Sequence, residues 1–287
     1  MIDPLDGPSA KGKPYSVYGD VSGFERRELD NTSLVVREGL ASAFVAVIEQ
    51  HETLYAWARE QEQPTALRGR APVYVAKLPT TPSIDIAVRH AWHGGMLAPV
   101  TSDRYLRPTR APRELMNSSQ LRAFKIPTPE FLGFALYKAG PFSVRVDVAT
   151  RYIPNSFDFS VVLRGVAPDI DRHDSIDAVE SLLVQLAAHG FTHPDLNVKN
   201  ILLYRNGQKL LAAVLDVDVV QWRQEVTPAT TMFANVSRLA RSMRKAERQF
   251  GIAIKDGELS AFVDRMLSAT PVSALRPGGI GTANPRQ

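Results

Sequence analysis

The 287-residue chain contains no cysteine, which excludes disulfides, thiolate metal sites and cysteine nucleophiles. It also has no apolar run as long as a membrane-spanning helix. The first residues lack the positive start and apolar run of a signal peptide. We therefore expect a cytosolic protein. Its composition, 44% hydrophobic and 22% charged, is that of an ordinary globular chain.

The chain also lacks a large excess of charge of either sign, because 34 basic side chains are almost balanced by 30 acidic ones. The formal net charge of +4 is a mild excess. An excess of this size mainly serves solubility, unless the basic side chains gather on one face.

The first half of the chain predicts strands and a few helices. Helical apolar spacing covers Leu34–Glu60, and a second helix is expected over Arg110–Phe124. β-like runs occur at Val73–Ala76, at Ile84–His90 and, with alternating valines, at Phe142–Tyr152.

The second half predicts helices around a hairpin. A helix capped by Asp174 or Ser175 should end at Gly190. Strands 201–204 and 210–215 are joined at Asn206-Gly207, which favours a type I′ turn. Two more helices are expected, at Thr230–Phe250 and Glu258–Ser268.

This order indicates an α+β fold with a β-rich small lobe and a mainly helical large lobe. The expected organisation is a disordered segment (1–30), an N-terminal helix with the small lobe (31–153), the large lobe (154–270) and a disordered tail (271–287).

The segment HPDLNVKNILLYRNGQKLLAAVLDVDV carries the strongest chemical signal. Asp195 follows His193 by two residues, Asn200 comes five later, and Asp216 ends the second strand of the hairpin. Phosphoryl transfer needs one carboxylate to orient a hydroxyl, and then an amide and a second carboxylate to hold Mg²⁺. We interpret Asp195 as the catalytic residue and Asn200 and Asp216 as metal ligands. Asp195 as a mere turn cap is the alternative, and a metal role for Asp218 stays open.

These residues resemble the protein-kinase-like superfamily. More narrowly, HPDLNVKNILL, VLDVD, NVSRLARSMRK, IAVRHAWHGG and KIPTPEFLG are similar to the bacterial lipopolysaccharide kinases, above all the 3-deoxy-D-manno-octulosonic acid (Kdo) kinases. The resemblance covers residues from about 66 to 250 and implies a two-lobed kinase fold that uses ATP and Mg²⁺. It also implies a structural, loop-bracing role for His193.

By the same resemblance, Arg89 takes the place of the lysine that binds the nucleotide phosphates, and Glu114 that of the glutamate orienting it. Arginine can pair bidentately with phosphate, although a surface arginine is the alternative. Gly69 is the single glycine where the phosphate-binding loop would have three, so Arg68 or Arg70 is a possible substitute.

Residues 89–113 hold five arginines with Trp92 and Tyr105. They form either a solvated loop or a docking face for an anionic, lipid-linked acceptor at a membrane surface. A nucleic-acid partner is not expected, since no such module is present.

The resemblance implies an ATP-dependent kinase that phosphorylates the Kdo sugar of a lipid A precursor, bound peripherally at the cytoplasmic face of the inner membrane. Between Asp216 and the helix expected from Thr230 there is too little chain for the activation segment of a protein kinase. The alternatives are a soluble small-molecule phosphotransferase of the aminoglycoside or choline type, and a catalytically inactive kinase-like binding module.

Overall fold

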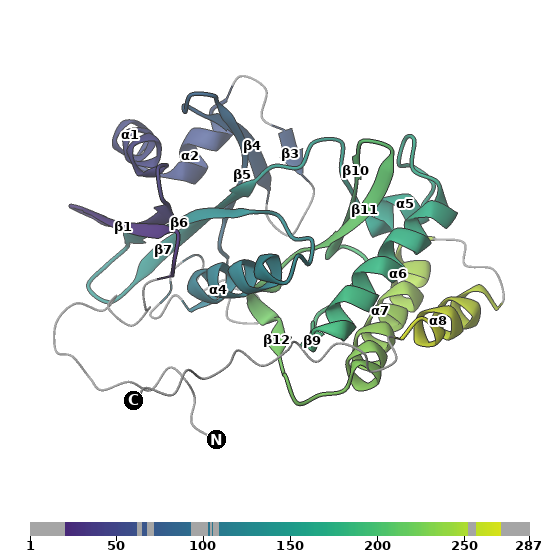
Figure 1. Ribbon diagram of the computed structural model, residues 1–287. Helices are drawn as coiled ribbons and strands as arrows, with labels where there is room; N and C mark the ends of the chain where they lie inside the picture. Colours follow the sequence, from purple (N-terminus) through teal and green to yellow (C-terminus); the bar gives the residue numbers. More distant parts are fainter. Residues whose placement is uncertain are drawn as a thin grey trace, which may run out of the picture. The chain divides into compact units, whose positions relative to one another are not determined.

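The computed structural model describes residues 21–61, 65–67, 72–92, 103, 105, 109–251 and 257–270 (Figure 1). The loop around Gly69, the first 20 residues and the tail after residue 270 lie outside this part, so the predictions made for them stay predictions. The chain divides into two compact units. The first runs to Ser119 and resumes at Glu130–Tyr152, and the second comprises Gln120–Pro129 and the chain from Ile153.

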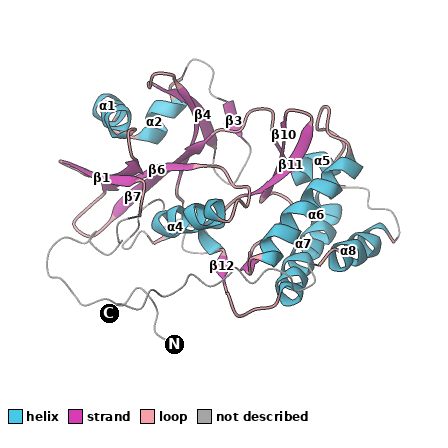
Figure 2. Cartoon of the chain, viewed as in Figure 1, coloured by secondary structure: helices cyan, strands magenta, loops and turns pink. Residues whose placement is uncertain are grey.

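The first unit is built on a seven-stranded antiparallel sheet, drawn in magenta in Figure 2. The order across it is β1-β2-β6-β7-β5-β4-β3. The strands are β1 (Phe24–Leu29), β2 (Thr32–Arg37), β3 (Thr65–Leu67), β4 (Val73–Leu78), β5 (Ile84–His90), β6 (Phe131–Lys138) and β7 (Val144–Arg151).

Side chains alternate between the two faces of the sheet along each strand, and both faces carry apolar side chains that pack against helices. One face, with Leu34 and Ile86, packs against α1 (Ala41–His51) and α2 (Leu54–Arg59). The opposite face, with Phe134, packs against the start of α4 (Arg110–Ala123).

The second unit is mainly helical. Its helices are α5 (Phe159–Leu163), α6 (Arg172–Ala188), α7 (Pro228–Phe250), α8 (Glu258–Ser268) and the 3₁₀ turn η1 (Val217–Val219). Its strands are β8 (Phe157–Asp158), β9 (Phe191–Thr192), β10 (Ile201–Asn206), β11 (Lys209–Val214) and β12 (Gln221–Trp222). An antiparallel sheet followed by a mainly helical region confirms the predicted α+β class.

Four strands of the first unit, β1, β2, β3 and β6, were not predicted. The helical spacing expected from Leu34 is wrong at its start, because Thr32–Arg37 is strand β2 and the first helix begins at Ala41. Phe24–Leu29, expected to be disordered, is β1 and pairs with β2. Its sequence FERREL is charged because it is an edge strand, where charged side chains oppose further pairing. The buried strand β6 reads FLGFALYK without alternation, so its pattern does not distinguish a strand from a buried helix.

Two local predictions in the second unit are wrong. The N-cap of α6 is Asp171, whose carboxylate accepts hydrogen bonds from the amides of His173 and Asp174, so the helix starts earlier than predicted. The hairpin turn is Gly207-Gln208, because Asn206 pairs with Lys209. Only Gly207 has a positive φ (60°), whereas a type I′ turn needs two such residues.

Candidate active site

The β10–β11 hairpin brings two predicted metal ligands to one end. Its register pairs Ile201 with Val214, and the Leu215 amide donates to the Asn200 carbonyl at 2.9 Å. Asn200 therefore enters the hairpin where Asp216 leaves it. Asp216 has left-handed backbone angles (φ 51°, ψ 47°), which aspartate tolerates better than most residues. This conformation ends β11 and turns the chain into η1.

Asn200 links this end of the hairpin to Asp195. Its Nδ2 donates to the Asp195 carbonyl at 2.9 Å, which leaves the amide Oδ1 as the group available to a cation. Asn200 is buried, whereas the Asp195 carboxylate is 56% exposed. The backbone of Asp195 is thus fixed while its carboxylate faces solvent.

The Asp195 carboxylate pairs with Arg238 of α7. Arg238 donates from one guanidinium nitrogen to Asp195 Oδ1 at 2.5 Å and from Nε to the Pro194 carbonyl at 2.9 Å. Within the described part of the chain, this carboxylate accepts no hydrogen bond from a backbone amide. The turn-cap alternative for Asp195 therefore finds no support in the hydrogen bonding.

Buried polar groups brace the start of the predicted catalytic loop, residues 193–200. His193 Nε2 donates to the Leu215 carbonyl at 2.9 Å, and its own amide donates to Asn235 Oδ1 at 2.9 Å. Asn235 Nδ2 in turn donates to the Phe191 carbonyl. Burial lowers the pKa of His193, outweighing its interactions with Leu215 and nearby carboxylates. His193 thus braces the loop as a neutral imidazole, the structural role inferred for it.

The donor set at the end of the hairpin fits Mg²⁺, which binds hard oxygen ligands and keeps several waters or substrate oxygens. Asp216 is exposed, and no described residue forms an ion pair with it. The described residues contain no cluster of three or more His, Asp or Glu side chains that could hold a metal alone. Asp216 is exposed although Val214 before it and Val217 after it are buried in the core.

In the first unit, Arg89 of β5 forms the predicted ion pair with Glu114 of α4. Glu114 is buried, with 8% of its side chain exposed, while the Arg89 side chain keeps 30%. The Arg89 side chain is therefore only partly covered. The surface-arginine alternative for Arg89 is therefore not favoured.

His90, the next residue on β5, is also ion-paired. Its Nδ1 lies 2.6 Å from Asp147 Oδ1, and its Nε2 lies 3.2 Å from Asp103. Burial lowers the pKa of His90, but hydrogen bonds and charge interactions with the two aspartates outweigh it and raise the pKa above its usual value. Asp147 also accepts the Tyr55 amide, so the cluster ties α2 to the sheet.

The arginine-rich segment 89–113 is described only in part, and Arg104 and Arg107 fall outside the described residues. Trp92 is 46% exposed, whereas Tyr105 is 92% buried and pairs with Val144 of β7. Tyr105 is thus a core residue rather than a surface aromatic, because its backbone adds a bridge to the sheet.

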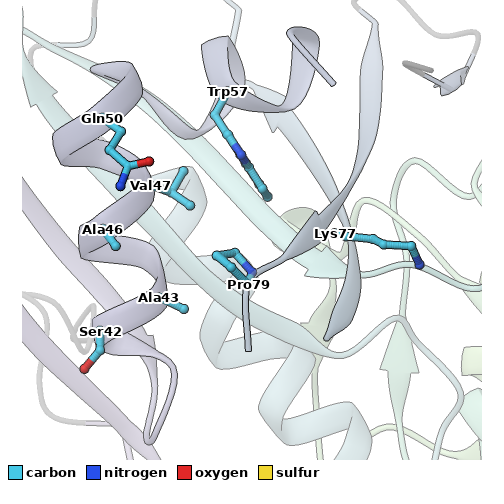
Figure 3. A pocket seen from close by; sticks show the side chains of 8 residues that line it. All are labelled: Ser42, Ala43, Ala46, Val47, Gln50, Trp57, Lys77 and Pro79. Atoms are coloured by element: carbon cyan, nitrogen blue, oxygen red, sulfur yellow. The ribbon is translucent and has the colours of Figure 1, made fainter. Parts of the chain in front are cut away.

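A cavity of about 550 Å³ lies in the first unit (Figure 3). Its lining comes from α1, α2 and the end of β4, and comprises Ser42, Ala43, Ala46, Val47, Gln50, Trp57, Lys77 and Pro79. None of the predicted site residues lines it.

Sequence reasoning missed Arg238 and Asn235, although both lie in the matched segment NVSRLARSMRK. Their contacts with the catalytic loop span more than 40 residues of sequence. An available signal was an asparagine on the buried side of an amphipathic helix, since a buried amide needs hydrogen-bond partners.

The comparisons with known proteins place the chain among the kinases. Residues 56–262 match the sequence profile of the Lipopolysaccharide kinase (Kdo/WaaP) family. The chain therefore belongs to this family, and membership implies a phosphotransferase that uses ATP.

Several relatives carry the name 3-deoxy-D-manno-octulosonic acid kinase. The chain is 24% identical to the one from Actinobacillus succinogenes over 206 residues, covering 70% of this chain and 83% of the relative. It is 25% identical to one from Haemophilus influenzae over 202 residues, covering 68% and 81%. A solved structure, WaaP in complex with acyl carrier protein, is 14% identical with a TM-score of 0.45, covering 82% and 98%.

No helix in the described ranges has the length and apolarity needed to cross a membrane.

Proposed function

We propose that the protein transfers the terminal phosphoryl group of ATP to a hydroxyl of the Kdo sugar on a lipid A precursor. The family supplies the class of reaction, and relatives named as Kdo kinases suggest the sugar. The observation that carries the proposal is the hairpin end, where Asn200 and Asp216 converge next to the backbone of Asp195.

In this proposal Asp195 orients the acceptor hydroxyl and accepts its proton, since its carboxylate is exposed on a fixed backbone. Asn200 and Asp216 hold Mg²⁺ through Oδ1 and the carboxylate. The ion, when bound, neutralises charge on the phosphoryl group in transfer. Arg89 binds the phosphates of ATP and Glu114 orients it, while Gly69 contributes backbone amides to the same phosphates.

The acceptor is lipid-linked, so we also propose peripheral attachment at the cytoplasmic face of the inner membrane. Arginines of segment 89–113 supply the charge, and the described residues Arg110 and Arg113 are exposed. Each basic side chain near an anionic surface contributes about 1 kcal/mol.

The test is phosphate transfer from labelled ATP to a panel of acceptors. The panel contains a Kdo-bearing lipid A precursor, the same precursor without Kdo, an aminoglycoside and choline. Transfer that requires Kdo is the expected result. Transfer only to aminoglycoside or choline would establish the small-molecule phosphotransferase, and ATP binding without any transfer would favour the inactive binding module.

A further inference from the structure

Helix α7 carries a marked excess of positive charge. Helix α7 contains five basic side chains and a single acidic one, Glu247, so its excess equals the +4 of the entire chain. The basic residues are Arg238, Arg241, Arg244, Lys245 and Arg248. The excess on α7 is separate from that of segment 89–113.

Four of these side chains lie along one line of the helix, and we call them the basic stripe: Arg238, Arg241, Lys245 and Arg248. At about 100° per residue they fall within an arc of about 80°. The stripe is about 15 Å long at 1.5 Å per residue. Arg241, Lys245 and Arg248 are exposed, and no described residue forms an ion pair with them.

The stripe borders the face of α7 that holds the catalytic loop. Asn235 and Ser242 lie on that face and hydrogen-bond the amides of His193 and Val198, respectively. Arg238 stands at the boundary, because it belongs to the stripe and also contacts Asp195 and the Pro194 carbonyl. The stripe therefore begins at the proposed catalytic carboxylate.

Helix stability does not account for the stripe. Cations near a helix C-terminus are favourable, which suffices for Arg248, the basic residue of the last turn. Arg238 and Arg241 lie in the middle of α7, where that benefit is gone. Like charges three or four residues apart repel, at a cost of a few tenths of a kcal/mol per pair. An anionic ligand would remove this repulsion.

We propose that the basic stripe is the docking surface for the phosphate and carboxylate groups of the acceptor saccharide. This inference rests on the proposed function and assigns the acceptor a place on α7. Its motivation is charge complementarity: an anionic, extended saccharide matches a line of four cations that leads to Asp195, and no described residue forms an ion pair with three of them, Arg241, Lys245 and Arg248.

Arg238 then determines specificity. Its pair with Asp195 is exposed, with 34% and 56% of the two side chains accessible, and such pairs are worth only about 0–1 kcal/mol. An acid group of the acceptor can therefore compete for the Arg238 guanidinium. Once Arg238 releases Oδ1 of Asp195, that oxygen can accept a hydrogen bond from the hydroxyl of the saccharide.

The first test is binding of a deacylated, phosphate-bearing Kdo saccharide to the full chain by titration calorimetry. The variant Arg241→Ser/Lys245→Ser removes two unpaired charges of the stripe. The matched control Lys209→Ser/Arg223→Ser removes two exposed charges of the same unit, away from the stripe. We expect about a tenfold rise in Kd for the stripe variant, as for the loss of two charge-assisted contacts, and none for the control. Phosphatase treatment of the saccharide should have a similar effect on the wild type.

The second readout is kinetic. The stripe variant should raise KM for the acceptor about tenfold and leave KM for ATP unchanged, and Arg241→Lys/Lys245→Arg should restore the wild-type value. Thermal melting checks that each variant is folded. If the wild type phosphorylates the saccharide and the stripe variant binds the saccharide as tightly as the wild type, this inference is overturned and the proposed function is not. Loss of binding to anionic liposomes, with saccharide binding retained, would also overturn it. Failure of the wild type to phosphorylate the saccharide would instead overturn the proposed function.

Discussion

At the scale of single residues, the roles proposed here depend on how each side chain is held. Asn200 offers Oδ1 because its Nδ2 is engaged by the Asp195 carbonyl. Glu114 is buried against a partly exposed Arg89, so the ion pair fixes the orientation of the guanidinium. Neighbouring groups thus hold the Asn200 and Arg89 side chains in fixed positions.

The Arg89–Glu114 pair predicts coupled kinetic losses. Arg89→Ala should raise KM for ATP and lower turnover, and Glu114→Gln should do the same because Arg89 loses its orientation. In the double variant the losses should fall short of the sum by about 0.5–3 kcal/mol, the usual coupling of contacting residues. Steady-state kinetics of the four proteins measures this. Strictly additive losses would show that the two residues act independently.

Two histidines should give the stability of the protein opposite pH dependences. The fold lowers the pKa of His193 below the value of about 6.5 that it has in the unfolded chain. Between these two pKa values the unfolded chain binds more protons than the folded one, so the stability of the protein falls as pH decreases from about 6.5. The pKa of His90 is raised, so its contribution is complete below about 6.5 and is lost as pH rises through the folded-state pKa.

Urea unfolding from pH 5 to 8, on the wild type, His193→Gln and His90→Gln, separates these effects. His193→Gln should reduce the loss of stability on the acid side, and His90→Gln the loss on the alkaline side. Identical pH dependence in all three proteins would contradict the assignments.

At the scale of elements, α7 organises the second unit. Thr227 caps it through the Thr230 amide, Pro228 suits its first turn, and Gly251 ends it with a positive φ of 62°. From this frame Asn235, Arg238 and Ser242 reach the catalytic loop at a spacing that keeps them on one side of the helix. The helix thus sets the conformation of the loop.

Replacement of Asn235 tests this role. Asn235→Leu leaves the His193 amide and the Phe191 carbonyl without their partner, and each buried unpaired group costs about 1–3 kcal/mol. We expect about 2–4 kcal/mol lower stability and a large loss of turnover. Asn235→Asp keeps the acceptor for His193 and should lose less. Chemical denaturation and activity measure both, and equal effects of Leu and Asp would contradict the account.

Local periodicity was sufficient for elements whose pattern matches their burial. Strand β5 and helix α8 have the predicted bounds, Ile84–His90 and Glu258–Ser268. It failed for the charged edge strand β1 and the uniformly apolar β6, whose patterns follow from their places in the sheet. Asp195, Asn200 and Asp216 could be predicted from the sequence because they share one short motif. Arg238 was not, because its partner is 43 residues away.

At the scale of the whole molecule, electrostatics predict where the protein resides. The arginines of segment 89–113 should hold the protein on anionic liposomes at low salt and release it at high salt, since screening acts within about 8–10 Å. Sedimentation of the wild type and of an Arg104→Ala/Arg107→Ala/Arg110→Ala variant measures this. Binding that is insensitive to salt, or retained in the variant, would contradict the role of this segment.

The most direct measurement of the central claim compares the wild type with Asp195→Asn in single-turnover phosphate transfer to the Kdo-bearing precursor. The account predicts transfer by the wild type and a rate lower by about 10²–10⁴ in the variant, the usual contribution of a general base, with ATP affinity unchanged. Asp216→Asn, examined in parallel, should abolish transfer through loss of a metal ligand. Transfer at the wild-type rate by both variants would show that the hairpin end is not the catalytic site.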